Sequence, residues 1–68
     1  MKAKDYCDIS AITYKIQDLA DQLATLGFES DRDDLYRIAQ GIQDYRDLET
    51  GDLTDEQIEA EWKTREEA

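Results

Sequence analysis

Carboxylates are the side chains in this sequence that could do chemistry, and most of them lie in its second half. The chain has 18 Asp and Glu residues, 8 Lys and Arg residues and no His, which gives a formal charge of -10. Carboxylates act as general acids and bases when two face each other across a substrate, and they bind cations when several converge. Catalytic carboxylate pairs and cation-binding carboxylate clusters each require a characteristic spacing of residues in the sequence. Neither spacing occurs in this chain.

A chain with this many carboxylates could bind calcium, so we first compare its sequence with known calcium-binding loops. The segment Leu53-Thr54-Asp55-Glu56-Gln57-Ile58 resembles the helix opening of calmodulin-type proteins, because both carry a capping box. A calcium loop needs Gly at its sixth position and Glu at its twelfth. Counted from Asp47, Gly51 falls fifth and Ile58 falls twelfth. A di-metal site in a helical bundle would need Glu-x-x-His pairs, and the chain has no His. We expect neither a metal site nor a cofactor.

Cys7 is the one cysteine, so it has no partner for an internal disulfide. A lone thiol is typical of a reducing compartment, which predicts a cytoplasmic protein. A thiol nucleophile normally needs a neighbouring base, usually His. No glycine-rich phosphate loop occurs, and 68 residues can hardly enclose a catalytic cleft. We therefore predict that the chain has no catalytic residues and is not an enzyme.

The net charge and the length of the chain exclude further classes of protein. Direct nucleic-acid binding requires clustered Lys and Arg, which this chain lacks. No apolar run approaches the ~20 residues of a membrane span. The start contains Lys2 and Lys4 without a following apolar stretch, so a signal peptide is not expected. Residues 1–68 are of the size expected for a single small helical domain.

Helical spacing is clearest in the first third of the chain. Six apolar residues, spaced alternately three and four apart, form an a/d stripe. They are Ile9, Ile12, Ile16, Leu19, Leu23 and Leu26. Ala20 and Ala24 flank the stripe and allow another helix to approach closely. The stripe predicts a helix over about 5–26 that ends at Gly27, with Phe28 packing back in a Schellman arrangement.

Two further helices follow by the same reasoning. Residues 31–50 contain Leu35, Ile38, Ile42, Tyr45 and Leu48 at helical spacing, with Gly41 in mid-helix. Close helix contact or a local bend would each explain that glycine. Residues 55–66 follow the capping box of Thr54 and Gln57 and carry Ile58 and Trp62.

Together these signals predict an all-α fold, a small three-helix domain. An antiparallel αα-hairpin of 5–26 and 31–50 is joined to a shorter third helix of 55–66. About fifteen large side chains form the candidate core, including the six of the first stripe together with Trp62. A core of that size leaves a single chain marginally stable.

The function that this pattern favours is binding of a protein with a basic surface. From Asp44 to Glu61 eight carboxylates are opposed by Arg46 alone, a density of the order found along a nucleic-acid strand. The predicted partner-binding residues are Asp31, Asp33, Asp34, Asp44, Asp47, Glu49, Asp52, Asp55, Glu56, Glu59 and Glu61. Such a surface would occupy the basic groove of a nucleic-acid-binding protein. In size and acidity the chain resembles small inhibitory or accessory proteins of bacteriophages and mobile elements.

Self-association is the alternative function. A regular a/d stripe on a short hairpin often continues into a second copy, so a homodimeric structural or adaptor module is the competing hypothesis. Its contact residues would be those of the first stripe, Ile9, Ile12, Ile16, Leu19, Leu23 and Leu26, together with Trp62. A solvated acidic face that serves solubility is the third explanation of the charge.

Overall fold

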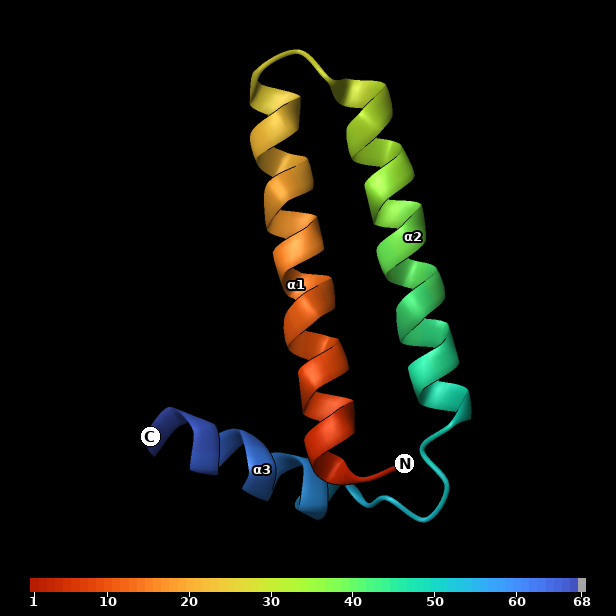
Figure 1. Cartoon of the computed structure of the whole chain (residues 1–68), viewed down its shortest axis with the longest axis vertical. Coiled ribbons are helices and arrows are strands. Elements are labelled where there is room, and N and C mark those ends of the chain that lie inside the picture. The colour runs from red at the N-terminus through yellow and green to blue at the C-terminus, as the bar shows by residue number, and fades with distance from the viewer. Residues whose placement is uncertain (68) are drawn as a thin grey trace.

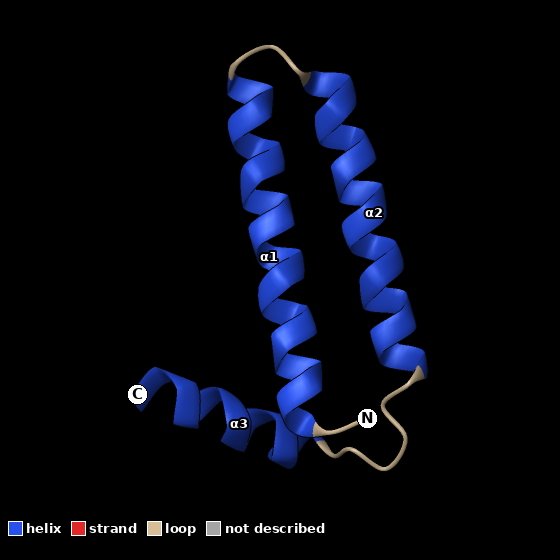
Figure 2. Cartoon of the chain, in the orientation of Figure 1, coloured by secondary structure: helices blue, strands red, loops and turns tan. Residues whose placement is uncertain are grey.

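The computed structural model describes residues 1–67 and contains three helices joined by short connections (Figure 2). They are α1 (Ala3–Thr25), α2 (Glu29–Leu48) and α3 (Asp55–Glu67). The predicted all-α fold is confirmed, and the described residues contain no strand. The predicted ranges differ from these bounds by at most two residues at each end.

The helices α1 and α2 form the predicted antiparallel hairpin, which Figure 1 shows as two long helices side by side. Gly27 has a φ of 98°, in the left-handed region that favours glycine. The Phe28 N–H donates to the carbonyl of Leu23 at 3.0 Å, and the Gly27 N–H donates to that of Ala24 at 3.1 Å. These two bonds are the predicted Schellman motif, and they reverse the chain within a few residues.

The start of α3 is fixed by the predicted capping box. Thr54 Oγ1 accepts the Gln57 N–H at 3.2 Å, and Gln57 Oε1 accepts the Thr54 N–H at 3.0 Å. Figure 1 shows α3 running across the end of the hairpin where α1 begins. Over residues 1–67, α3 packs against α1 and makes no packing contact with α2.

Small and polar side chains join α1 to α2, along a line that we call the seam. The seam contains Tyr6, Ser10, Thr13 and Ala20 of α1 with Ala39, Gln43 and Arg46 of α2. Ser10, Thr13, Ala20 and Ala39 are buried. Because these side chains are short, they permit a close approach of the two helices, and no large apolar side chain of the described residues is fully buried there.

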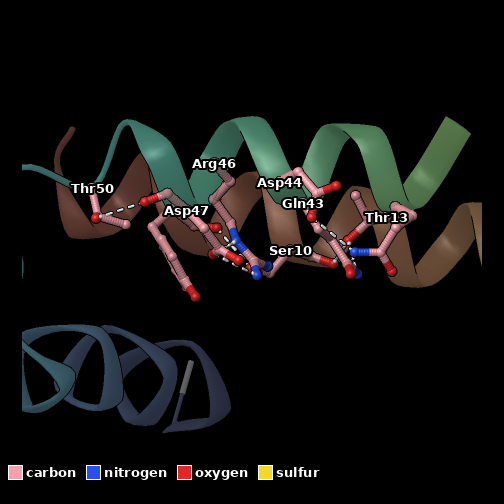
Figure 3. Close-up of polar contacts among 9 residues, drawn as sticks. Ser10, Thr13, Gln43, Asp44, Arg46, Asp47 and Thr50 are labelled. Carbon is pink, nitrogen blue, oxygen red and sulfur yellow. Dashed lines mark hydrogen bonds and ion pairs between the residues drawn. The ribbon is translucent and has the colours of Figure 1, made fainter.

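Polar contacts run along one half of the seam (Figure 3). Arg46 Nη1 donates to Ser10 Oγ at 2.7 Å, and Gln43 Nε2 donates to Thr13 Oγ1 at 3.3 Å. The Arg46 guanidinium carbon lies 4.4 Å from the centre of the Tyr6 ring. The guanidinium charge is therefore held by a hydroxyl and an aromatic face, between the two helices.

The expectation of a core made of large apolar side chains is wrong for the single chain. Ile12 is 54 % exposed, Leu19 57 % and Leu26 73 %, while Ile9, Ile16, Leu23 and Trp62 are only half-buried. The reason is rotational. Ile9, Ile12 and Leu19 each precede a seam residue by one position, which turns them by about 100° around the helix. The stripe therefore borders the seam and does not fill it.

The molecule is one helix thick. Its principal extents are 40 × 28 × 13 Å, and an α-helix with its side chains is about 10–12 Å across. Its radius of gyration is 14.0 Å, whereas a compact domain of this length would have about 11 Å. Every helix consequently has at least one broad side open to solvent.

Candidate interaction surfaces

The predicted acidic residues lie at two ends of the hairpin. Asp31, Asp33 and Asp34 occupy the first turns of α2, beside the turn from α1, and the others follow from Asp44 to Glu61 around the opposite end (Figure 1). Ten of the eleven are exposed, and Glu61 is half-buried. The fold thus keeps these carboxylates in water but does not gather them into a single site.

Arg46, the one basic residue between Asp44 and Glu61, is turned inward. Its side chain is only 12 % exposed and binds Ser10 and Tyr6 in the seam. The one carboxylate that it pairs with is its neighbour Asp47, at 3.0 Å. The one positive charge within this stretch of sequence is therefore committed to joining α1 and α2, and does not neutralise the surface beyond Asp47.

Five carboxylates that follow Arg46 are both exposed and without an ion pair to any side chain that the structure describes. We call them the acidic segment: Glu49, Asp52, Asp55, Glu56 and Glu59. They lie on the α2–α3 connection and the first half of α3. By contrast, Asp33 is paired with Arg32 at 3.0 Å, and Asp34 with Arg37 at 3.8 Å. Glu29 and Asp31 at the opposite end are also exposed without such a pair, so the unpaired carboxylates lie at both ends and are most numerous in the acidic segment.

A charged cluster that was not predicted from the sequence fixes α3 on α1. Arg65 Nη2 donates to the Lys4 carbonyl at 3.0 Å and to Asp8 Oδ1 at 2.5 Å. Lys4 Nζ also donates to Asp8 Oδ2 at 2.9 Å. Hydrogen bonds from Lys4 and Arg65 hold the pKa of Asp8 below its usual value. The Arg65 guanidinium also lies 5.6 Å from the Trp62 ring centre, which orients both side chains of α3.

Cys7 lies beneath α3 and is fully buried. Its Sγ donates to the carbonyl of Ile58 at 3.7 Å, and removal from water raises the pKa of the thiol. A buried thiol with a raised pKa is a poor nucleophile. Cys7 therefore serves the packing of α3 on α1.

Exposed and half-buried apolar side chains of both long helices share one side of the hairpin, which we call the apolar face. In α1 it consists of the stripe from Ile9 to Leu26, and in α2 of Leu35, Ile38, Ile42 and Tyr45. Ile38, Ile42 and Tyr45 each precede a seam residue of α2 by one position, as Ile12 and Leu19 do in α1. Because α1 and α2 are antiparallel, the same offset turns both sets toward the same side of the hairpin.

The apolar face is uncovered. Ile38 is 54 % exposed and Tyr45 62 %, similar to Ile12 and Leu19 on α1. Leu48, at the rim of the face, is 83 % exposed. α3 does not cover it, because α3 contacts α1 through Lys4, Cys7 and Asp8, which point elsewhere around that helix. This face was expected to be the interior of the domain and is instead its broadest apolar surface.

Comparisons with known proteins give no family assignment. No protein-family model matches the chain. Searches of curated proteins and of solved structures give no significant match. Over residues 1–67, none of the helices combines the length and the hydrophobicity that crossing a bilayer requires.

Proposed function

We propose that the chain is a binding protein without catalytic activity, which presents its acidic segment to a partner with a basic surface. One observation carries this proposal: Arg46 is sequestered in the seam, so Glu49, Asp52 and the carboxylates of early α3 have no ion pair with a side chain that the structure describes. Exposed and uncompensated carboxylates create a negative potential that attracts a basic surface over about a Debye length. Phosphate-binding surfaces are the basic surfaces most suited to such a segment.

The partner class that fits is a nucleic-acid-binding protein whose groove normally holds a phosphate backbone. The chain would compete with nucleic acid for that groove and so act as an inhibitor or modulator. Attraction of this kind is strongly salt-dependent, which separates it from binding through apolar contacts.

A capture experiment with the immobilised full chain tests the proposal. Proteins of a lysate are captured at about 50 mM and about 500 mM salt and identified, with duplex DNA or RNA as competitor. We expect nucleic-acid-binding proteins to be captured at low salt and to be released by high salt and by the competitor. Capture of the same proteins at both salt concentrations would contradict the proposal.

Two variants of equal charge identify the surface. The test variant neutralises Asp52→Asn, Asp55→Asn, Glu56→Gln and Glu59→Gln. The control neutralises four exposed acids elsewhere, Asp5→Asn, Asp18→Asn, Glu29→Gln and Glu66→Gln. Both sets include residues in the first turn of a helix, so dipole effects are matched. We expect capture to fall at least about tenfold for the test variant only. Equal losses would show that overall charge, and not the acidic segment, determines binding.

A further inference from the structure

We propose that the apolar face is a dimer interface, covered by the same face of a second copy of this chain, so that two hairpins stack into a two-layer helical bundle. This proposal concerns a different surface from the acidic segment and does not depend on it. It rests on the thickness of the molecule, its excess surface, the inverted polarity of the hairpin and the position of Gly41.

Thickness is the first argument. Stable domains consist of at least two packed layers of secondary structure, because each element must bury its apolar side against another. The hairpin is two helices side by side and so a single layer, α3 lies across one end of it, and the whole chain extends only 13 Å along its shortest axis. A second hairpin stacked on the apolar face would supply the missing layer at the usual helix separation of about 8–10 Å.

The surface area is the second argument. A compact monomer of 7.9 kDa exposes about 4,400 Å², whereas this chain exposes 5096 Å². The excess of about 700 Å² is close to the roughly 800 Å² that each partner contributes to a stable protein interface. The surplus surface of one chain is therefore about what one dimer interface requires.

The inverted polarity of the hairpin is the third argument. The seam contains Ser10, Thr13 and Arg46, while leucine, isoleucine and tyrosine side chains of the same helices face water. The rows of the apolar face hold no charged residue between Ile9 and Leu26 on α1 or between Leu35 and Tyr45 on α2, and Asp5, Asp31 and Glu49 continue them at the two ends. A second copy can therefore cover the middle of the face without burying a charge, with these acids left at the solvent-exposed ends of the contact, despite the net charge of -10 on each chain.

Gly41 is the fourth argument. It lies in mid-α2 at the rim of the apolar face, beside Ile42, where alanine would favour the helix by about 1 kcal/mol. A Cβ built on Gly41 would meet nothing within 4 Å in the chain, so packing within the chain does not explain the glycine. A close approach by a helix of the second copy does explain it.

A second copy fits this face better than an unrelated apolar partner. An a/d stripe is matched by helices of the same period, since each side chain enters a space between residues of the facing helix. The same face on a second chain has that period in both of its helices and has the same length. A two-fold axis through the centre of the face would pair the two copies in a closed dimer.

Sedimentation velocity of the full chain over ~1 to ~100 µM, with three single substitutions, tests the proposal. At the upper concentration the wild-type chain is expected to sediment as a dimer, with twice the 7.9 kDa mass of one chain. Leu19→Asp on α1 and Ile38→Asp on α2 should each raise the dimer dissociation constant at least ~100-fold, because the substituted residue occurs twice in the interface. Tyr14→Asp is the matched control: Tyr14 is 58 % exposed, like Leu19 at 57 %, but points away from the apolar face. It should leave the dissociation constant within about threefold of wild type.

Circular dichroism shows whether each variant keeps its helices, and both outcomes are informative. A helical monomer for Leu19→Asp and Ile38→Asp, beside a dimeric Tyr14→Asp, supports the interface. Loss of helix in Leu19→Asp and Ile38→Asp, but not in Tyr14→Asp, also supports the interface. Both substituted side chains are more than half exposed in a single chain, so folding can depend on them only through contacts with a second chain. A wild-type chain that remains monomeric at ~100 µM would overturn the proposal, as would equal effects of Leu19→Asp and Tyr14→Asp.

Discussion

Removing the Arg46 guanidinium tests whether the polar seam holds the hairpin together. The substitution Arg46→Met keeps a long apolar side chain between α1 and α2 but removes the charge. It eliminates the 2.7 Å hydrogen bond to Ser10 Oγ and the contact with the Tyr6 ring. The Arg46 side chain is 12 % exposed, so water cannot replace these partners without opening the seam.

The expected cost follows from these two contacts. A hydrogen bond from a charged donor contributes roughly 1.5–3 kcal/mol, and a partly buried cation–π contact adds about 0.5–1 kcal/mol. Methionine recovers part of this loss through packing. We therefore expect Arg46→Met to lower the free energy of unfolding by about 2–3 kcal/mol, equivalent to a fall of roughly 10–20 °C in melting temperature.

Urea unfolding, followed by circular dichroism at one protein concentration, measures this cost. A double-mutant cycle with Ser10→Ala isolates the hydrogen bond, and we expect a coupling of about 1 kcal/mol or more. Arg37→Met is the control on the same helix, because the Arg37 side chain is 82 % exposed and lies 3.8 Å from Asp34. It should cost less than about 0.5 kcal/mol. The reasoning is refuted if Arg46→Met costs no more than Arg37→Met, or if the coupling is zero.

Three further predictions concern the turn and the packing of α3. Gly27→Ala forces a Cβ onto a residue with φ of 98°, so urea unfolding should show a loss of about 1–2 kcal/mol, whereas no loss would contradict the Schellman assignment. The lowered pKa of Asp8 means that its stabilising effect is present above its ordinary value of 3.8 and is lost as pH falls below it. Trp62 fluorescence should therefore change in that acid range in wild type but not in Asp8→Asn, and identical titrations would contradict this role for Asp8. Cys7 should react with iodoacetamide far more slowly at pH 8 in the folded chain than in urea, since burial both shields the thiol and raises its pKa, and equal rates would place it at the surface.

Helix positions could be predicted from the sequence because their signals are local. Gly27 ends α1, and Thr54 with Gln57 begins α3, through bonds that span five residues or fewer. The predicted start of α2 at residue 31 was two residues late, because the Schellman turn allows the helix to begin directly after Phe28.

The pairing of helix faces could not be predicted in the same way. The a/d spacing shows that Ile12 and Leu19 share a side of α1, but it does not say whether that side meets α2. Ala20 was the available signal, since a small residue beside the stripe permits close approach and is found in the seam. The bond between Arg46 and Ser10 joins residues 36 apart, and that between Arg65 and Asp8 joins residues 57 apart. No local pattern specifies such pairs. The residues of the seam and the position of α3 on α1 could therefore be identified only from the structure.

The polarity of the seam has a consequence for the order in which the chain folds. Ser10, Thr13 and Arg46 gain little from being removed from water, so an isolated hairpin has a weak drive to form. In the proposed dimer, the larger release of water would come when two apolar faces meet. Folding would then be a second-order process, with a refolding rate that rises in proportion to chain concentration. At concentrations below the dimer dissociation constant the chain would then be less stable, and its own rate of synthesis would determine when the stable form accumulates.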